Sequence, residues 1–210
     1  MYKFKNYIFD WSGTLVDDLG PVLDSTNRVF NHYGKDSFTR EEFCSEFCLP
    51  FKIFYDKFLP EAPMSELELL YTKFFNESKE NVFLLPGAKE ILRECSNLGI
   101  KTYLLSSIKK QHFESQSAKL GLLNVFDSAY TEALDKRDWI TRLLKDNNIT
   151  PEGTVFIGDM QHDIETARFA GVFSVGVLTG YNSKEMIEES NPDLIVNDLV
   201  ELLEIIVNKS

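Results

Sequence analysis

The strongest constraint on the fold is a regular alternation of short apolar runs with longer helical segments, which begins at Pro86. Glycines such as Gly99, Gly121 and Gly171 stand where the intervening helices would end. With one more run near the N-terminus, the pattern predicts strands at 4–9, 100–105, 126–130, 155–157, 173–177 and 194–196, and helices at 86–97, 109–120, 136–147, 163–170, 183–189 and from 198. Strands separated by helices form parallel sheets with right-handed crossovers. The sequence therefore predicts an α/β protein with a doubly wound parallel sheet.

Residues 18–83 have a different pattern, because no strand signal interrupts their helical periodicity. One helix is predicted over 20–33. Capping boxes, in which Ser or Thr is followed three residues later by Glu, predict two more helix starts at Thr39 with Glu42 and at Ser65 with Glu68. We therefore expect an α/β core domain formed by 1–17 and 84–210, and an all-helical domain inserted at 18–83.

The inserted segment is rich in phenylalanine, including Phe43, Phe47, Phe54 and Phe58 at helical spacing. Such a stripe can line an apolar substrate pocket, but a small helical bundle needs one simply to have a core. We expect most of these rings to be core residues.

Composition excludes several classes of protein. A net charge of −11 argues against binding to nucleic-acid phosphates, which requires a clustered basic face. No apolar stretch approaches the roughly 18 residues that span a bilayer, and the N-terminus does not resemble a signal peptide. We expect a cytoplasmic protein that binds neither membranes nor nucleic acid; its oligomeric state does not follow from the sequence.

The three cysteines, Cys44, Cys48 and Cys95, are too few for a disulfide framework. Cys44 and Cys48 lie four residues apart, so a metal pair is an alternative, but no third ligand is near them in sequence. Buried free thiols are common, and the core interpretation is favoured.

The segment Asp10-Trp11-Ser12-Gly13-Thr14 directly follows the first predicted strand. Ligands bind at the carboxyl ends of strands in open α/β sheets, so Asp10 is placed where a functional carboxylate is expected. Gly13 and Thr14 suit a tight turn whose backbone N–H groups can bind an anion. This combination indicates a nucleophile in a phosphate-handling site.

Further polar residues occupy comparable positions along the chain. Ser106 ends the strand predicted at 100–105, and Lys136 opens a helix. Asp159 and Asp163 follow the strand predicted at 155–157. In this order, the four segments resemble the motifs of the haloacid dehalogenase superfamily, whose members mostly transfer phosphoryl groups through an aspartyl-phosphate with the help of Mg²⁺. The resemblance spans nearly the whole chain.

The resemblance implies roles for the metal-binding residues. Asp10 would be the nucleophile and a Mg²⁺ ligand, and Asp159 a direct ligand. Ser12 would offer its main-chain carbonyl to Mg²⁺, and Asp163 would hold a metal-bound water or orient Lys136. Carboxylate and carbonyl oxygens are the ligands that Mg²⁺ prefers.

The resemblance also implies how the phosphoryl group is bound. Ser106 would donate its hydroxyl to a phosphoryl oxygen, with the N–H of Ser107 beside it. Lys136 would offset the negative charge on the nucleophile and the phosphoryl group. Gly13 and Thr14 would shape the loop that receives the substrate.

The inserted helices resemble the cap of the phosphoglycolate phosphatase and phosphonatase branch. A cap of this kind closes over the substrate, excludes water and contacts the leaving group. The joints are expected near 17–20 and 82–86.

Ser12 departs from the superfamily pattern, in which phosphatases usually carry an aspartate two residues after the nucleophile. That aspartate protonates the leaving oxygen and later activates water, and positioned acid–base catalysis is typically worth about 10²- to 10⁴-fold. A serine hydroxyl cannot replace it unaided. The favoured interpretation is still a phosphatase for a small phosphorylated metabolite, with a slow second step or one assisted by His162 or a cap group.

Three alternatives remain. Trp11 and a small residue at position 12 also resemble phosphonoacetaldehyde hydrolase, in which a cap lysine forms a Schiff base with a phosphonate substrate; Lys52 lies where that lysine would be expected, although a surface lysine is the commoner case. A phosphate-binding regulatory protein with little turnover would lack more of the motif residues. A dehalogenase would have little use for Asp159 and Asp163, and it ranks last.

Overall fold

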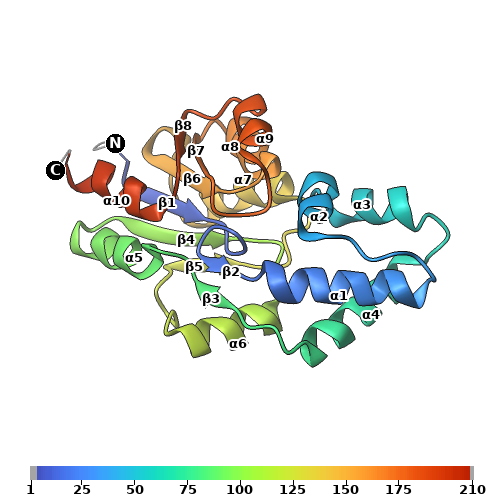
Figure 1. Ribbon diagram of the computed structural model, residues 1–210. Helices are drawn as coiled ribbons and strands as arrows, with labels where there is room; N and C mark the ends of the chain where they lie inside the picture. Colours follow the sequence, from blue (N-terminus) through green and yellow to red (C-terminus); the bar gives the residue numbers. More distant parts are fainter. Residues whose placement is uncertain (1–3, 209–210) are drawn as a thin grey trace. The chain divides into compact units, whose positions relative to one another are not determined.

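Six parallel strands form the central sheet in the computed structural model, which describes residues 4–208 (Figure 1). They are β1 (Asn6–Phe9), β4 (Lys101–Leu105), β5 (Ser128–Tyr130), β6 (Thr154–Gly158), β7 (Phe173–Val177) and β8 (Leu194–Val196). Their order across the sheet is β5-β4-β1-β6-β7-β8, and every neighbouring pair is parallel. The predicted doubly wound sheet is confirmed.

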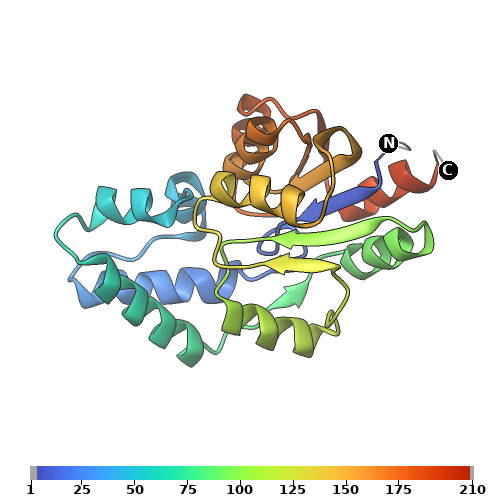
Figure 2. The same ribbon diagram turned by 180° about the vertical axis from the view of Figure 1, so that it is seen from behind.

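Helices cover both faces of this sheet. They are α5 (Ala88–Asn97), α6 (Lys110–Leu120), α7 (Lys136–Asp146), α8 (Gln161–Ala170), α9 (Lys184–Glu189) and α10 (Leu199–Val207), with a short 3₁₀ turn at Pro151–Gly153. The chain moves from β1 through β4 to β5, and then in the opposite direction from β6 to β8. Right-handed crossovers then place α5 and α6 on one face and α7, α8 and α9 on the other, as Figures 1 and 2 show. The last helix, α10, packs against α5.

Such sheets bind ligands at the point where the order of strand addition reverses, which here lies between β1 and β6. Phe9 in β1 is level with Leu104 in β4 and with Ile157 in β6. The residues that follow these three strands therefore emerge at one edge of the sheet. Crevices at the carboxyl ends of strands beside a reversal are the usual binding sites of doubly wound folds.

Apolar side chains fix these strands against the helices. Ile8 and Phe156, from the two central strands, are almost completely buried against Ile140 and Leu143 of α7. Strands buried on both faces need continuous apolar sequence, and this explains the uninterrupted run Tyr7-Ile8-Phe9.

Two short strands that the sequence pattern did not predict lie where the chain leaves and re-enters this part of the molecule. β2 (Val16–Asp17) pairs with β3 (Phe83–Leu84) in antiparallel register. Two residues per strand are too few to show an alternating pattern. The pairing begins six positions after Asp10 in the sequence.

The structure divides at this point into two compact units, a core unit that ends at Asp17 and resumes at Phe83, and a second unit formed by Asp18–Val82. The second unit contains α1 (Leu19–His32), α2 (Arg40–Glu46), α3 (Phe51–Phe58) and α4 (Met64–Glu77), and α1 packs against α4. Its described elements are all helical.

The phenylalanines of the second unit pack against one another, as expected of a bundle core. Phe43 and Phe54 are almost fully buried. Ring centroids of Phe54 lie 5.7 Å from Phe38, 5.5 Å from Phe47 and 5.2 Å from Phe58. The predicted packing role of this stripe is confirmed.

Of the two predicted capping boxes, one is confirmed and one is wrong. Thr39 and Glu42 form a complete capping box at the start of α2. Ser65 does not begin a helix, because α4 starts at Met64 with Pro63 as its N-cap residue, so Ser65 lies within the first turn. The helix predicted from Pro86 begins at Ala88, since Gly87 has a φ of +83° and cannot be helical.

Candidate active site

A tight loop after β1 places Asp10 at the carboxyl edge of the sheet. Inside the loop, the N–H of Gly13 donates to the carbonyl of Val16 at 2.8 Å, and the carbonyl of Trp11 accepts from Leu15 at 2.9 Å. Gly13 has a φ of +73°, and a Cβ there would lie 2.3 Å from Asp159 Oδ2. Only glycine meets both requirements, so the loop needs this residue.

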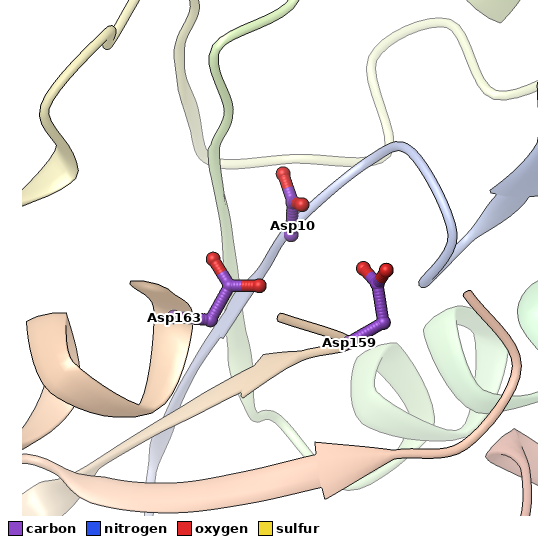
Figure 3. Close-up of side chains that lie close together, drawn as sticks. All are labelled: Asp10, Asp159 and Asp163. Atoms are coloured by element: carbon purple, nitrogen blue, oxygen red, sulfur yellow. The ribbon is translucent and has the colours of Figure 1, made fainter. Parts of the chain in front are cut away.

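Three carboxylates from separate segments meet beside this loop (Figure 3). Asp10 follows β1, Asp159 follows β6, and Asp163 lies in the first turn of α8. All three are buried, and one oxygen from each lies within 4.8 Å of those of the other two. It is the one cluster of this kind that the described residues contain.

Lys136, the first residue of α7, is completely buried and provides the positive charge of the cluster. Its Nζ donates to Asp163 Oδ1 at 2.6 Å and lies 2.9 Å from Asp10 Oδ1. A lysine at this depth needs such partners, because an unpaired buried ammonium is strongly unfavourable.

The pKa values reflect the crowding of these charges. Burial raises the pKa of Asp10, although Lys136 opposes the shift. Burial together with repulsion from Asp10 and Asp163 raises the pKa of Asp159 well above its usual range. Burial also disfavours the charge on Lys136, but Asp10 and Asp163 outweigh it and raise the lysine pKa.

The residues present fit a divalent cation. With three ionised carboxylates and one ammonium, the cluster has two negative charges in excess, which a divalent ion would balance. All three candidate ligands are carboxylate oxygens, the type that Mg²⁺ and Ca²⁺ prefer. The cluster can therefore hold a metal ion of this class.

Other residues predicted for the site follow the neighbouring strands β1 and β4 at the same edge of the sheet. Ser106 directly follows β4 and is buried, and its hydroxyl accepts from the N–H of Ile108 at 3.4 Å. Ser107 is half-buried beside it. Ser12 is also half-buried and forms a β-bridge with Val16.

Thr14 does more than shape the loop, which was its predicted role. Its hydroxyl donates to Asp159 Oδ1 at 2.9 Å, so the loop that carries Asp10 also orients the carboxylate that follows β6.

His162 supports Lys136 through the backbone. Its Nε2 accepts a hydrogen bond from the N–H of Lys136 at 3.0 Å. Burial, reinforced by the nearby lysine charge, lowers the pKa of His162 to about 4. The Nε2 lone pair is thus already engaged, which argues against His162 as the group that compensates for Ser12.

Lys52 belongs to a different unit from these residues. It lies in the second unit, on α3, where its side chain is 64% exposed and paired with Asp56 at 2.5 Å. Cys44 and Cys48 of the same unit form no disulfide and are only half-buried, whereas Cys95 is buried as expected of a core thiol.

One segment at the site was missed by the sequence analysis, the turn after β7. Thr179 donates its hydroxyl to the carbonyl of Gly13 at 2.7 Å, and the N–H of Tyr181 donates to Asp159 Oδ2 at 2.8 Å. The available signal was Gly180 between polar residues, directly after a predicted strand.

Comparisons with known proteins agree with this geometry. Residues 7–177 match the family model described as haloacid dehalogenase-like hydrolase, and the chain belongs to that family. It is 25% identical over 201 residues to a phosphoglycolate phosphatase from Synechococcus elongatus, covering 94% of each chain. It is 24% identical over 215 residues to the pyrophosphatase PpaX from Bacillus mycoides, covering 97% of each. These relatives place it in the phosphoglycolate phosphatase-like branch of the family.

The fold is also similar to those of solved structures. A haloacid dehalogenase-like family hydrolase from Streptococcus pneumoniae superposes with a TM-score of 0.88 at 21% identity, covering 98% of this chain and all of the other. Among the described residues of this chain, no helix has the length and apolar character needed to cross a membrane.

Proposed function

We propose that this protein is a Mg²⁺-dependent phosphatase that hydrolyses a small phosphorylated metabolite through a covalent aspartyl-phosphate on Asp10. The proposal depends mainly on one observation: three buried carboxylates and a buried ammonium lie together at the carboxyl edge of the sheet. They belong to Asp10, Asp159, Asp163 and Lys136. The phosphatase and pyrophosphatase names of its relatives support the reaction class.

In this mechanism, a carboxylate oxygen of Asp10 attacks phosphorus, and the bond to the leaving oxygen breaks. Lys136 offsets the negative charge that the nucleophile and the phosphoryl group bring together. Ser106 and the N–H of Ser107 donate to phosphoryl oxygens. Asp10, Asp159, Asp163 and the carbonyl of Ser12 are the proposed metal ligands; bound Mg²⁺ would supply charge neutralisation and orient the phosphoryl group.

Both halves of the reaction lack the usual acid–base group at position 12, so the leaving oxygen takes its proton from solvent and water attacks the aspartyl-phosphate without a positioned base. Ser12 cannot take up a proton near neutral pH, and His162 already uses Nε2 to accept the N–H of Lys136. For a leaving group that needs little acid assistance, such as the phosphate released from pyrophosphate, the second step is then the slower one, and we expect the phosphoenzyme to accumulate during turnover.

We further propose that the helical unit Asp18–Val82 acts as the cap that selects the substrate. Its connections to the core unit are the adjacent strands β2 and β3, and the first of these follows Asp10 by six residues. The insertion therefore follows the proposed nucleophile closely in the sequence, as the resemblance to capped phosphatases implies.

The test is release of inorganic phosphate from phosphoglycolate, pyrophosphate, other small phosphate esters and phosphonoacetaldehyde, with Mg²⁺ and with a chelator. We expect Mg²⁺-dependent release from at least one ester, and a hydroxylamine-sensitive phosphoenzyme in acid-quenched samples. Asp10→Asn, which has the same shape without the nucleophilic charge, should abolish both. Full activity of Asp10→Asn would refute the covalent mechanism.

The same experiment separates the phosphonatase alternative. Phosphate release from phosphonoacetaldehyde, with inactivation by borohydride that Lys52→Arg prevents, would assign phosphonate cleavage instead. Absence of that inactivation, together with ester hydrolysis, would support the phosphatase.

A further inference from the structure

The turn after β7, residues 179–182, contacts both loops that carry the acidic cluster. Thr179 Oγ1 donates to the carbonyl of Gly13, in the loop of Asp10, at 2.7 Å. Tyr181 N donates to Asp159 Oδ2 at 2.8 Å. Asn182 Oδ1 accepts from the N–H of Gln161, which begins α8, at 2.8 Å. This turn therefore connects β7 to the two loops from which Asp10 and Asp159 extend.

Gly180 packs directly against the carboxylate of Asp159. A Cβ at position 180 would lie 1.9 Å from Asp159 Oδ2 and 2.3 Å from its Cγ. On the other side, a Cβ at Gly13 would lie 2.9 Å from Gly180 Cα. Asp159 is thus held between two glycines, and a methyl group at either position would displace it.

The close packing around Asp159 opposes an electrostatic repulsion. Asp159 is buried beside two carboxylates of like charge, and repulsion favours its rotation away from Asp10 and Asp163. Two hydrogen bonds oppose that rotation, one to each carboxylate oxygen, from Thr14 Oγ1 and Tyr181 N. Groups that orient a metal ligand in this way typically change metal affinity about 10- to 100-fold when removed.

We propose that the turn of residues 179–182 is a positioning element, which holds Asp159 in the orientation needed to bind a divalent cation. Thr179, through its hydroxyl, and Gly180, through its lack of a side chain, are its main determinants, and both act through other residues. The inference rests on the proposed function only in taking Asp159 as a metal ligand.

The test compares metal binding by the purified full-length protein and its variants, using titration calorimetry with Mg²⁺ and electron paramagnetic resonance with Mn²⁺. Gly180→Ala should weaken binding about 10- to 100-fold. Thr179→Val, which has the same shape without the hydroxyl, should weaken it less, and Thr179→Ser should restore it. In steady-state assays, the Mg²⁺ activation constant should rise, while kcat recovers at saturating Mg²⁺.

Two matched controls lie at the opposite end of β6. Gly153→Ala adds a methyl group with only ordinary contacts, the nearest at 3.7 Å. Thr154→Val removes a hydroxyl-to-carbonyl hydrogen bond of the same 2.7 Å length, to Thr150. Both should bind metal like the natural protein.

The outcomes separate the inference from the proposed function. If the natural protein binds metal, and the folded variants Gly180→Ala and Thr179→Val bind it equally well, the positioning role alone is overturned. Natural protein that binds no Mg²⁺ or Mn²⁺ overturns the proposed metal site, and the positioning role with it. If Gly180→Ala does not fold, the pair Thr179→Val and Thr179→Ser decides.

Discussion

Asp159 shows the cost of assembling a metal-binding cluster inside a protein. Burial and two neighbouring carboxylates raise its pKa well above normal, so its ionised form is unfavourable while no cation is bound. We expect Asp159→Asn to increase the free energy of unfolding in chelator by about 0.5–2 kcal/mol, because it removes one repelling charge and keeps the shape. Urea denaturation measures this change.

The same variant should lose the response to metal. Mg²⁺ should raise the midpoint of unfolding of the natural protein, since a ligand that binds only the folded state stabilises it, and should leave Asp159→Asn unchanged. Asp36→Asn, at an exposed position in the second unit, serves as the control. A less stable Asp159→Asn in chelator would contradict the electrostatic argument.

Ser12 permits a test by gain of function. Ser12→Asp would restore a carboxylate two residues after Asp10, and acid–base catalysis is typically worth about 10²- to 10⁴-fold. We expect faster ester hydrolysis and a smaller steady-state fraction of phosphoenzyme. Ser12→Asn, which is similar in size but not an acid, should give neither effect, and an unchanged rate for Ser12→Asp would show that hydrolysis of the intermediate is not limited by this position.

Among the elements, the start of β4 is hydrogen-bonded to the carboxylate of Asp127, which directly precedes β5. Asp127 accepts from Lys101 Nζ at 2.6 Å and from the N–H of Thr102 at 3.0 Å. Burial raises its pKa, but these two donors outweigh burial and leave the pKa below its usual value of 3.8. The folded state therefore binds this proton less tightly than the unfolded state does.

It follows that Asp127 stabilises the fold above the unfolded-state pKa and loses this contribution as the pH falls through the lower folded-state value. We expect Asp127→Asn to be less stable than the natural protein at pH 7, with the difference shrinking below about pH 4. Urea denaturation across this range measures it. A difference that does not change with pH would mean that packing, and not charge, is responsible.

The elements also show which parts of the fold can be predicted from sequence. Short runs rich in apolar residues between helical segments predicted β7 and β8 at their observed limits. Helix ends at Gly121 and Gly171 were predictable because both glycines adopt positive φ. β2 and β3 were not, since their pairing depends on residues more than sixty positions apart.

The same distinction holds at the candidate site. Asp10 and Asp159 could be placed together because parallel strands share a carboxyl edge. The hydrogen bonds from Thr14 and Tyr181 to Asp159 could not be predicted, because the local sequence does not show which side chain a turn will contact. Lys52 had only its position in the inserted segment to support it.

On the scale of the whole molecule, the division into two units predicts separable effects of core mutations. Phe54 is 1% exposed among the rings of the second unit, and Phe54→Ala should destabilise that unit by about 3–5 kcal/mol. The acidic cluster lies entirely in the core unit, so metal binding should survive. Limited proteolysis should map new cleavage to residues 18–82, while calorimetry shows unchanged affinity for Mg²⁺.

Ile140→Ala is the matched variant in the core unit, where Ile140 is completely buried. It should weaken metal binding as well as stability. Loss of metal binding in Phe54→Ala would show instead that the two units unfold together.

Trp11 places an optical probe directly next to Asp10 in the chain. Its fully buried indole donates to Gln116 Oε1 at 2.6 Å and meets the ring of Phe113 edge-on at 4.9 Å. The chain has one other tryptophan, Trp139, on α7. Because indole emission responds to nearby charge and Trp11 is covalently joined to Asp10, fluorescence of a Trp139→Phe protein would follow events at the carboxylate cluster in real time, without any added label.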